Sequence, residues 1–207
     1  MKVLIINGSP NKEGCTARAL KEVEDILIKE GIEVENIRIG KSPIGGCISC
    51  GYCKEHPGCV FNDLVNEIAK KFETSDGLLI GTPTYYAGSN GTLISILDRL
   101  FMSTRFNKSM KVGAAVVSSR RGGSTSAFDE INKYFTICGM PIVSSTYWNE
   151  VHGHTPNDVE KDKEGLQTMR NLGRNMSFLI KAINDAKEKY GLPIKERNYY
   201  TSFSDGK

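Results

Sequence analysis

The chain has 207 residues, of which 39% are hydrophobic and 25% are charged, and 27 basic against 24 acidic residues give a net charge of +3. This length is enough for one large domain whose core needs no disulfide bonds. The small charge is spread along the sequence and does not indicate nucleic-acid binding. The sequence shows no pattern typical of a signal peptide or of a membrane span. We expect a cytoplasmic protein that binds neither nucleic acid nor a membrane.

The first half of the chain alternates between strand and helix patterns. The continuous apolar run at 2–6 predicts a strand buried on both faces, and apolar residues at helical spacing predict a helix over 16–30 that ends at Gly31. Alternation over 32–39 predicts a more exposed edge strand. After a cysteine-rich loop, the sequence predicts a helix near 61–73, a buried strand at 76–81 and a helix near 91–102.

The second half repeats this order. We predict a strand at 111–118, a helix near 125–138, a strand at 141–148 and a long helix near 163–189. Five strands alternating with five helices predict a doubly wound α/β fold, with a parallel sheet covered by helices on both faces. The domain covers 1–190, and 191–207 form either a loose tail or an oligomer arm. The last helix carries an apolar stripe for the core or a subunit interface: Leu166, Met169, Leu172, Met176, Leu179 and Ile183.

The loops after the first four predicted strands share an unusual composition. In an open parallel sheet these loops leave from the same edge, where ligands bind. The loops at 7–16, 40–59, 82–91 and 118–126 are long and rich in Gly, Ser, Thr or Pro. We expect them to form one composite binding site, although ordinary polar turns are the alternative.

The first of these loops, GSPNKEGCT, lies between a strand and a helix. The backbone N–H groups of a helix N-terminus favour an anion there, and Ser9 and Thr16 can add hydroxyl donors. The loop is not a P-loop, because Cys15 stands where the lysine of that motif would be. A phosphate monoester fits this loop better than a triphosphate, and a simple Ser-Pro turn is the other interpretation.

The third and fourth loops suit a flat ligand. In TPTYYAGSNG, small residues allow close approach of the backbone, and Tyr85 or Tyr86 can lie against a ring or simply pack the loop. In SSRRGGSTS, backbone N–H groups and Arg120 or Arg121 can meet a polar ring edge.

The segments GSPNKEGCTA, GTPTYYAGSNGTLISILDRL and EGLQTMRNLGRNMSFLIKAI, with the Gly-Gly of the fourth loop, resemble the flavodoxin-like, NAD(P)H-dependent FMN reductase superfamily. The resemblance implies a five-stranded sheet in the order 2-1-3-4-5 and bound FMN. Asn11 stands where many members carry an arginine. The implied FMN-binding residues are Ser9, Asn11, Cys15, Thr16 and Ala17 at the phosphate, Pro83, Thr84, Tyr85, Tyr86, Ala87 and Gly88 along the ring, and Ser118, Ser119, Arg120, Gly122 and Gly123 at its pyrimidine edge.

The second loop contains Cys47, Cys50, Cys53 and Cys59 in the spacing C-x2-C-x2-C-x5-C. Within the superfamily this run resembles the iron-sulfur flavoproteins, which implies a [4Fe-4S] cluster. The chemistry agrees, because such a cluster needs four thiolates around a small volume, and the nearby glycines let backbone N–H groups face the sulfurs. A zinc site, a redox pair of Cys50 and Cys53, and thiols without a cluster are the alternatives.

Three further residues lie outside these motifs. His152 and His154 follow the last predicted strand and either line the flavin site, protonate a substrate or lie on the surface without such a role. Cys138 lies at a predicted helix end and is expected to be a small buried hydrophobic residue.

Together these features predict an FMN-dependent oxidoreductase that links a two-electron and a one-electron partner. The donor would be a nicotinamide or a small redox protein such as ferredoxin, and the acceptor a quinone, a flavin or another small molecule. A cluster-free flavin or quinone reductase, a flavodoxin-type carrier and an FMN-binding sensor are the alternatives. Because the cysteine loop leaves the second strand, away from the ring loops, we also expect a homodimer or homotetramer that brings one subunit's cysteines to another's flavin.

Overall fold

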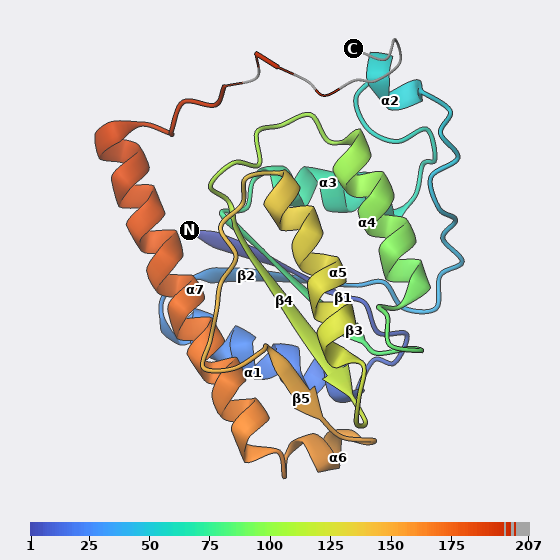
Figure 1. Ribbon diagram of the computed structural model, residues 1–207, viewed down its shortest axis with the longest axis vertical. Helices are drawn as coiled ribbons and strands as arrows, with labels where there is room; N and C mark the ends of the chain where they lie inside the picture. Colours follow the sequence, from blue (N-terminus) through green and yellow to red (C-terminus); the bar gives the residue numbers. More distant parts are fainter. Residues whose placement is uncertain (197, 200, 202–207) are drawn as a thin grey trace.

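The computed structural model describes residues 1–196, 198–199 and 201, and its centre is a five-stranded parallel sheet in the order β2-β1-β3-β4-β5 (Figure 1). The predicted fold class and strand order are therefore confirmed. Parallel strands need a crossover between neighbours, and helices supply each one. The strands are β1 (Lys2–Asn7), β2 (Glu33–Arg38), β3 (Gly77–Pro83), β4 (Val112–Ser119) and β5 (Glu150–His152).

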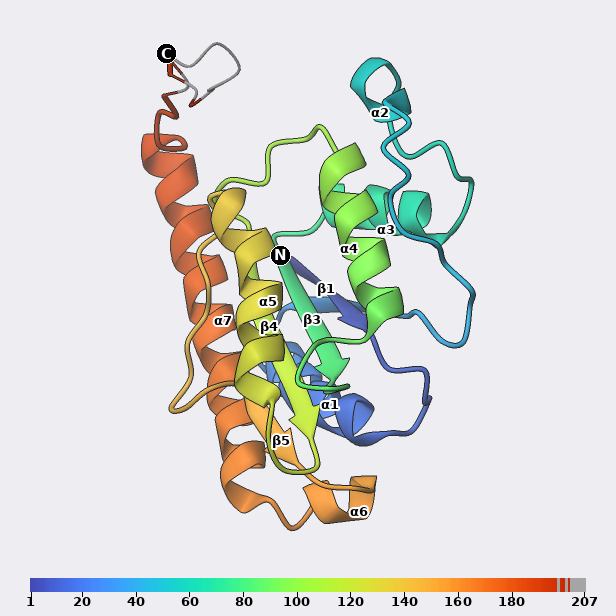
Figure 2. The ribbon, with the colours of Figure 1, turned by 45° about the vertical axis from the view of Figure 1, so that its right-hand side comes forward.

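Helices cover both faces of the sheet (Figures 1 and 2). On one face α1 and α7 pack against apolar residues of β1, β3 and β4, and the predicted stripe of α7 lies in this core, with Met169, Leu172 and Met176 fully buried. On the other face α3, α4 and α5 enclose a second core around Phe72 and Phe135. The helices are α1 (Cys15–Lys29), α2 (Tyr52–Glu55), α3 (Leu64–Glu73), α4 (Gly91–Ser103), α5 (Ser124–Ile137), α6 (Pro156–Val159) and α7 (Lys163–Tyr190).

Strand β2 is the exposed edge that its alternating sequence predicts. Its Glu35 accepts hydrogen bonds from the ammonium groups of Lys2 on β1, at 2.6 Å, and of Lys71 on α3. These contacts hold the pKa of the Glu35 carboxyl below its usual range, first through the hydrogen bond from Lys2 and then through that from Lys71. The edge strand is thus fixed to its neighbours by charge as well as by its backbone ladder.

The predicted strand at 141–148 is wrong in position. Within it, Ile142 makes a single bridge to Gly113, and the chain then bends away from the sheet until β5 pairs with Val117–Ser119. The fully buried Asn149 closes this bend, because its side chain donates to the carbonyl of Val143 at 3.3 Å. A side-chain amide thus replaces part of the backbone ladder.

Two short helices, α2 and α6, were not predicted, and α3 begins at Leu64 instead of near 61 because the Asp63 carboxylate caps it by accepting from the N–H of Val65. The described part of 191–207 has no regular secondary structure, and positions 197, 200 and 202–207 of the predicted tail lie outside the described residues. Among the helices of the described residues, none has the length and apolarity needed to cross a membrane.

Candidate functional site

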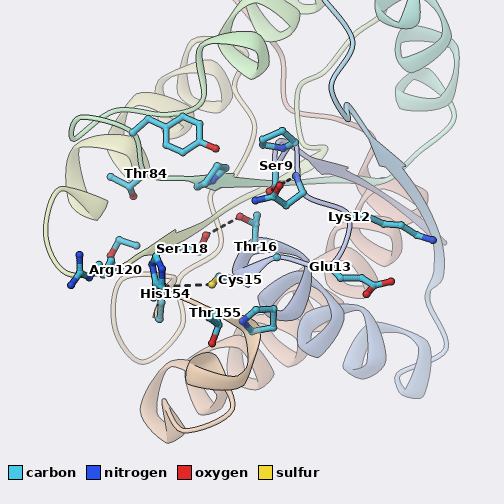
Figure 3. Close-up of a pocket in the computed structure, with 18 of the residues that line it drawn as sticks. Ser9, Lys12, Glu13, Cys15, Thr16, Thr84, Ser118, Arg120, His154 and Thr155 are labelled. Carbon is cyan, nitrogen blue, oxygen red and sulfur yellow. Dashed lines mark hydrogen bonds between the residues drawn. The ribbon is translucent and has the colours of Figure 1, made fainter.

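A cavity of about 840 Å³ opens at the carboxyl edge of the sheet (Figure 3). Its walls come from the first, third and fourth loops, from the segment after β5, and from Arg38 and Lys41 at and just after the end of β2. Ten of the predicted FMN-binding residues line it: Ser9, Asn11, Cys15, Thr16, Pro83, Thr84, Tyr85, Ser118, Ser119 and Arg120. We call this space the rim cavity.

The first loop presents the N-terminus of α1 to the rim cavity. Gly14 is the N-cap of α1, no side chain of the described residues caps this end, and its first turn holds no acidic residue. The loop is held in shape by its own short side chains, since Asn7 Oδ1 accepts from the N–H of Ser9 at 2.9 Å and Ser9 Oγ accepts from the N–H of Asn11 at 3.2 Å. An uncapped helix end beside a preformed loop is suited to an anion.

Gly8 brings this loop against the end of β3. The Gly8 N–H donates to the carbonyl of Gly81 at 2.8 Å. A Cβ atom at Gly8 would lie 2.6 Å from Leu93 Cδ2 and 2.8 Å from the same carbonyl oxygen, which are impossible separations. The absence of a side chain at Gly8 therefore sets how closely the first and third strand ends approach.

Hydroxyl groups form the floor of the rim cavity. Thr16 Oγ1 and Ser118 Oγ are hydrogen-bonded at 2.8 Å, which joins the first loop to the fourth (Figure 3). The buried hydroxyls of Thr84 and Ser119 also belong to residues of the lining, and neither has a hydrogen-bond partner within the described chain. Because a buried hydroxyl without a partner costs free energy, two of them in residues of one lining make the rim cavity a candidate site for a polar ligand.

The lining of the rim cavity is positively charged. Lys12, Arg38, Lys41 and Arg120 contribute four cations against the single carboxylate of Glu13. Arg38 extends from the end of β2 and donates to the carbonyl of Pro10 at 3.3 Å. The loop motifs do not identify Arg38 and Lys41, because the sequence gives no spacing that relates β2 to the first loop. This excess of positive charge favours an anionic ligand.

Cys15 lies at the start of α1 and donates its thiol hydrogen to the carbonyl of Gly153 at 3.5 Å. Burial raises the pKa of this thiol, a backbone hydrogen bond at Cys15 partly offsets the rise, and the nearby carboxylate of Asp158 adds to it. At neutral pH Cys15 is therefore a neutral thiol in the first loop, not a nucleophilic thiolate.

The third loop turns tightly away from the rim cavity. Tyr85 and Gly88 exchange backbone hydrogen bonds of 2.9 and 3.0 Å, and the residues between them, Tyr86 and Ala87, have positive φ angles of 49° and 61°. Such strain in residues other than glycine is concentrated at functional sites. Six predicted FMN-binding residues do not line the cavity: Ala17, Tyr86, Ala87, Gly88, Gly122 and Gly123.

Gly123 nevertheless has a structural role beside this turn. Its φ is +89°, and a Cβ atom there would lie 2.8 Å from the Cα of Ala87. Close packing of Gly123 on Ala87 therefore connects the third and fourth loops.

The two histidines after β4 have different environments. His154 lines the rim cavity with its neighbours Thr155 and Pro156, and Figure 3 shows its ring between Arg120 and Cys15. The His152 N–H donates to Asp162 Oδ2 at 2.7 Å, and its ring lies 3.8 Å from the same carboxylate, outside the lining. Of this pair, His154 is the candidate for contact with a ligand.

The cysteine loop forms a separate cavity. Cys47, Cys50, Cys53 and Cys59 line a space of about 160 Å³, and none of the four lines the rim cavity. Ser103 at the end of α4 also lines it, and its buried hydroxyl has no partner in the described part of the molecule. We call this space the cysteine cavity.

The prediction of one composite site for all four loops is therefore wrong for the cysteines. The loop leaves the carboxyl edge and runs to the opposite end of α4, whose 13 residues span about 20 Å (Figures 1 and 2). Helix α4 begins where the third loop ends, and its last two residues, Met102 and Ser103, line the cysteine cavity. Within the described residues, no three His, Cys, Asp or Glu side chains come close enough to bind one metal ion.

Arg99 and Arg105, near the end of α4, contact the cysteine loop. Arg99 is 2% exposed, and its Nε donates to Cys59 Sγ at 3.3 Å. Burial lowers the pKa of Arg99, but hydrogen bonds to Asp63 and Cys59 outweigh burial and raise the pKa overall. Arg105 is exposed and donates to the carbonyl of Cys53 at 2.7 Å.

Comparison with known proteins relates this arrangement to one family. The model of the family described as NADPH-dependent FMN reductase matches residues 1–155. The chain belongs to the NADPH-dependent FMN reductase family. Within this family it lies in the iron-sulfur flavoprotein branch.

Two relatives support this branch of the FMN reductase family. An iron-sulfur flavoprotein of Methanocaldococcus jannaschii is 36% identical over 191 residues, which cover 88% of this chain and 99% of that protein. An iron-sulfur flavoprotein of Methanosarcina thermophila is 28% identical over 193 residues, which cover 91% and 100%.

Solved structures with low sequence identity share the fold of this FMN reductase family member. RosB with a bound riboflavin-phosphate intermediate has a TM-score of 0.69 at 15% identity, with 98% of this chain and 92% of that chain covered. An archaeal flavodoxin has a TM-score of 0.60 at 17% identity, with 87% and 99% covered. These neighbours confirm the flavodoxin-like fold.

Proposed function

We propose that the protein is an FMN-dependent oxidoreductase that binds FMN in the rim cavity and a [4Fe-4S] cluster in the cysteine cavity. The observation that carries the flavin part is the pair of buried hydroxyls of Thr84 and Ser119, which lack partners at the cavity lining. The family match and the flavoprotein names of the relatives agree with it.

The residues of the rim cavity fit the two ends of FMN. The uncapped N-terminus of α1, with Ser9 and Thr16, would hold the phosphate, and the cations Lys12 and Arg38 would balance its charge. Pro83, Thr84 and Tyr85 would lie along the ring, while Ser118, Ser119 and Arg120 would meet its polar edge.

Bound FMN would supply one- and two-electron redox chemistry, and a cluster would supply one-electron transfer. The chain itself needs no nucleophile for this role. Its side chains would bind and orient the flavin, and His154 lies in the lining, where its ring could hydrogen-bond to a bound substrate.

The cysteine cavity fits a cluster better than a single ion. All four cysteines line one space, and no three of the described metal-ligand side chains meet at single-ion distance. The unpartnered hydroxyl of Ser103 and the donor that Arg99 directs at Cys59 Sγ are further groups suited to an anionic cluster.

One anaerobic preparation tests both parts of this proposal. We expect FMN and iron in the wild-type protein, and Cys53→Ala should lose iron while it retains FMN, because the two cavities are separate. FMN without iron in freshly prepared wild-type protein would leave a cluster-free reductase or a flavodoxin-type carrier. Turnover with NADH, NADPH or reduced ferredoxin then identifies the donor, and the absence of nicotinamide oxidation would favour the carrier.

The separation of the two cavities along α4 also supports the proposed homo-oligomer. In a homodimer or homotetramer, the cysteine loop of one copy would lie beside the rim cavity of another. Light scattering of the loaded protein measures the oligomeric state. A strictly monomeric preparation that exchanged electrons between the two cofactors at full rate would contradict this arrangement.

A further inference from the structure

Arg99 is the largest fully buried side chain of the described chain. Arginine is rarely buried in a protein core unless all its donors are paired. Helix α4 places it on the side that faces the cysteine loop, one turn before Met102 and Ser103, which line the cysteine cavity. Packing alone does not explain why the charged side chain of Arg99 is buried.

The guanidinium of Arg99 is held rigidly by acceptors on several sides. Its two terminal nitrogens donate to the two carboxylate oxygens of Asp63 at 2.8 and 2.9 Å, and one of them also donates to the carbonyl of Gly45 at 3.2 Å. The ring of Phe61 lies 4.8 Å from the guanidinium carbon. Because the guanidinium is planar and fixed in this way, its Nε–H can donate in only one direction, toward Cys59 Sγ at 3.3 Å.

Cys59 is the cysteine that most needs such support. Five residues separate it from Cys53, whereas only two residues separate each of the other three from the next. Its backbone is clamped by Asn66, which accepts from the Cys59 N–H at 2.8 Å and donates to the Cys59 carbonyl at 2.9 Å. Asn66 and Arg99 together turn this distant thiol back toward the other three.

A buried ion pair such as Arg99 and Asp63 does not by itself explain why the charges are retained, since apolar residues of similar volume often serve stability as well. The hydrogen bond to sulfur is what an apolar residue could not supply. Across the described residues, no side-chain donor reaches the sulfur of Cys47, Cys50 or Cys53. The donor is therefore specific to one of the four proposed ligands.

We propose that Arg99 positions Cys59 and, by donating to its sulfur, raises the reduction potential of the cluster that the cysteine cavity holds, while Asp63 sets how much of the Arg99 charge the cluster experiences. This inference rests on the proposed function. Its physical basis is that a donor to a ligand sulfur stabilises the added negative charge of the reduced cluster more than it stabilises the oxidised one.

The test is an anaerobic redox titration of the loaded protein, followed by electron paramagnetic resonance for the cluster and by absorbance for FMN. Arg99→Lys keeps the charge but loses the fork and the Nε donor, and it should lower the equilibrium constant for one-electron reduction of the cluster about tenfold, which is about 59 mV. Asp63→Asn can still accept a hydrogen bond as the N-cap of α3 but removes the compensating charge, so it should shift the cluster potential upward. The FMN potential should stay unchanged in both variants.

Arg105→Lys is the matched control, because it makes the same charge-keeping change at an exposed arginine that contacts the Cys53 carbonyl, not a sulfur. Its cluster potential should equal that of the wild type. Shifts of opposite sign in Arg99→Lys and Asp63→Asn support the proposal, because loosened packing would shift the cluster potential in the same direction in both variants. Potentials that equal the wild type, or that move together, would overturn it.

Iron content separates this inference from the proposed function. Wild-type protein without iron refutes the cluster itself, whereas iron with unmoved potentials refutes the role of Arg99 alone. Loss of iron from Arg99→Lys, with FMN and the circular dichroism spectrum retained, supports the positioning of Cys59, and Asp63→Asn then tests the potential.

Discussion

Thr16 Oγ1 and Ser118 Oγ, 102 positions apart in the chain, meet at 2.8 Å on the floor of the rim cavity. Both side chains are buried. The bond fixes the first loop, which receives the phosphate in our proposal, to the fourth loop, which receives the polar ring edge. This hydrogen bond therefore helps to set the distance between the first and fourth loops.

Thr16→Val removes this bond with little change of shape and leaves the Ser118 hydroxyl buried without it. We expect the FMN-free protein to lose about 1–3 kcal/mol of unfolding free energy, as buried groups without partners do. FMN should bind about two- to tenfold more weakly. Urea unfolding and flavin fluorescence titration measure the two effects. Thr16→Ser, which keeps the hydroxyl, should remain close to the wild type, and equal losses in both variants would contradict the role of the bond.

Ser119→Ala should separate ligand binding from stability. The Ser119 hydroxyl has no partner to lose in the described chain, so its removal should leave the stability of the FMN-free protein unchanged or slightly higher. If it donates to or accepts from FMN, the affinity should fall about two- to tenfold.

The matched control for this variant is Ser177→Ala. Ser177 also has a buried hydroxyl without a partner among the described residues, but it lies in α7, outside the rim cavity. Its removal should have a similar effect on stability and none on FMN affinity. Equal FMN affinities in the two variants, measured by the same titration, would remove Ser119 from the flavin site.

Gly8→Ala should destabilise the protein, because the added methyl group would overlap Leu93 and the carbonyl of Gly81. Overpacking of this kind costs about 1–3 kcal/mol, and the first loop should move away from β3 to relieve it. Thermal unfolding measures the loss. Gly91→Ala is the control: an added Cβ there meets no atom of the described chain within 4 Å, so stability should stay the same or rise slightly.

The carboxylate of Glu35 should make stability depend on acid pH. Lys2 and Lys71 lower its pKa in the folded protein, so its contribution is fully present above the unfolded pKa of about 4.3 and is lost as the pH falls through the lower folded pKa. Glu35→Gln should therefore unfold at a lower temperature than the wild type at pH 7, and the gap should close below that range. A gap of constant size from pH 7 to pH 3 would show that the charge is not responsible.

The periodicity of the sequence predicted β1, β2, β3 and β4 close to their observed positions. It was wrong at 141–148, because the Asn149 side chain, and not the local alternation, decides where pairing with β4 resumes. The loop motifs likewise identified Thr16, Ser118 and Ser119, but not Arg38 or Lys41. These two cations reach the rim cavity through the position of β2 beside β1, which no local pattern encodes.

By itself the sequence determined the fold class, the strand order through its family resemblance, and two sets of candidate residues for redox chemistry. The tertiary structure decided how those sets are arranged. It placed the cysteines at the far end of α4 from the rim cavity, and it brought Arg99 of that helix against Cys59, 40 positions earlier in the chain. The physical reason is that the spacing of residues in a sequence limits which side chains can meet within one loop. Contacts between distant elements depend instead on how the helices pack on the sheet.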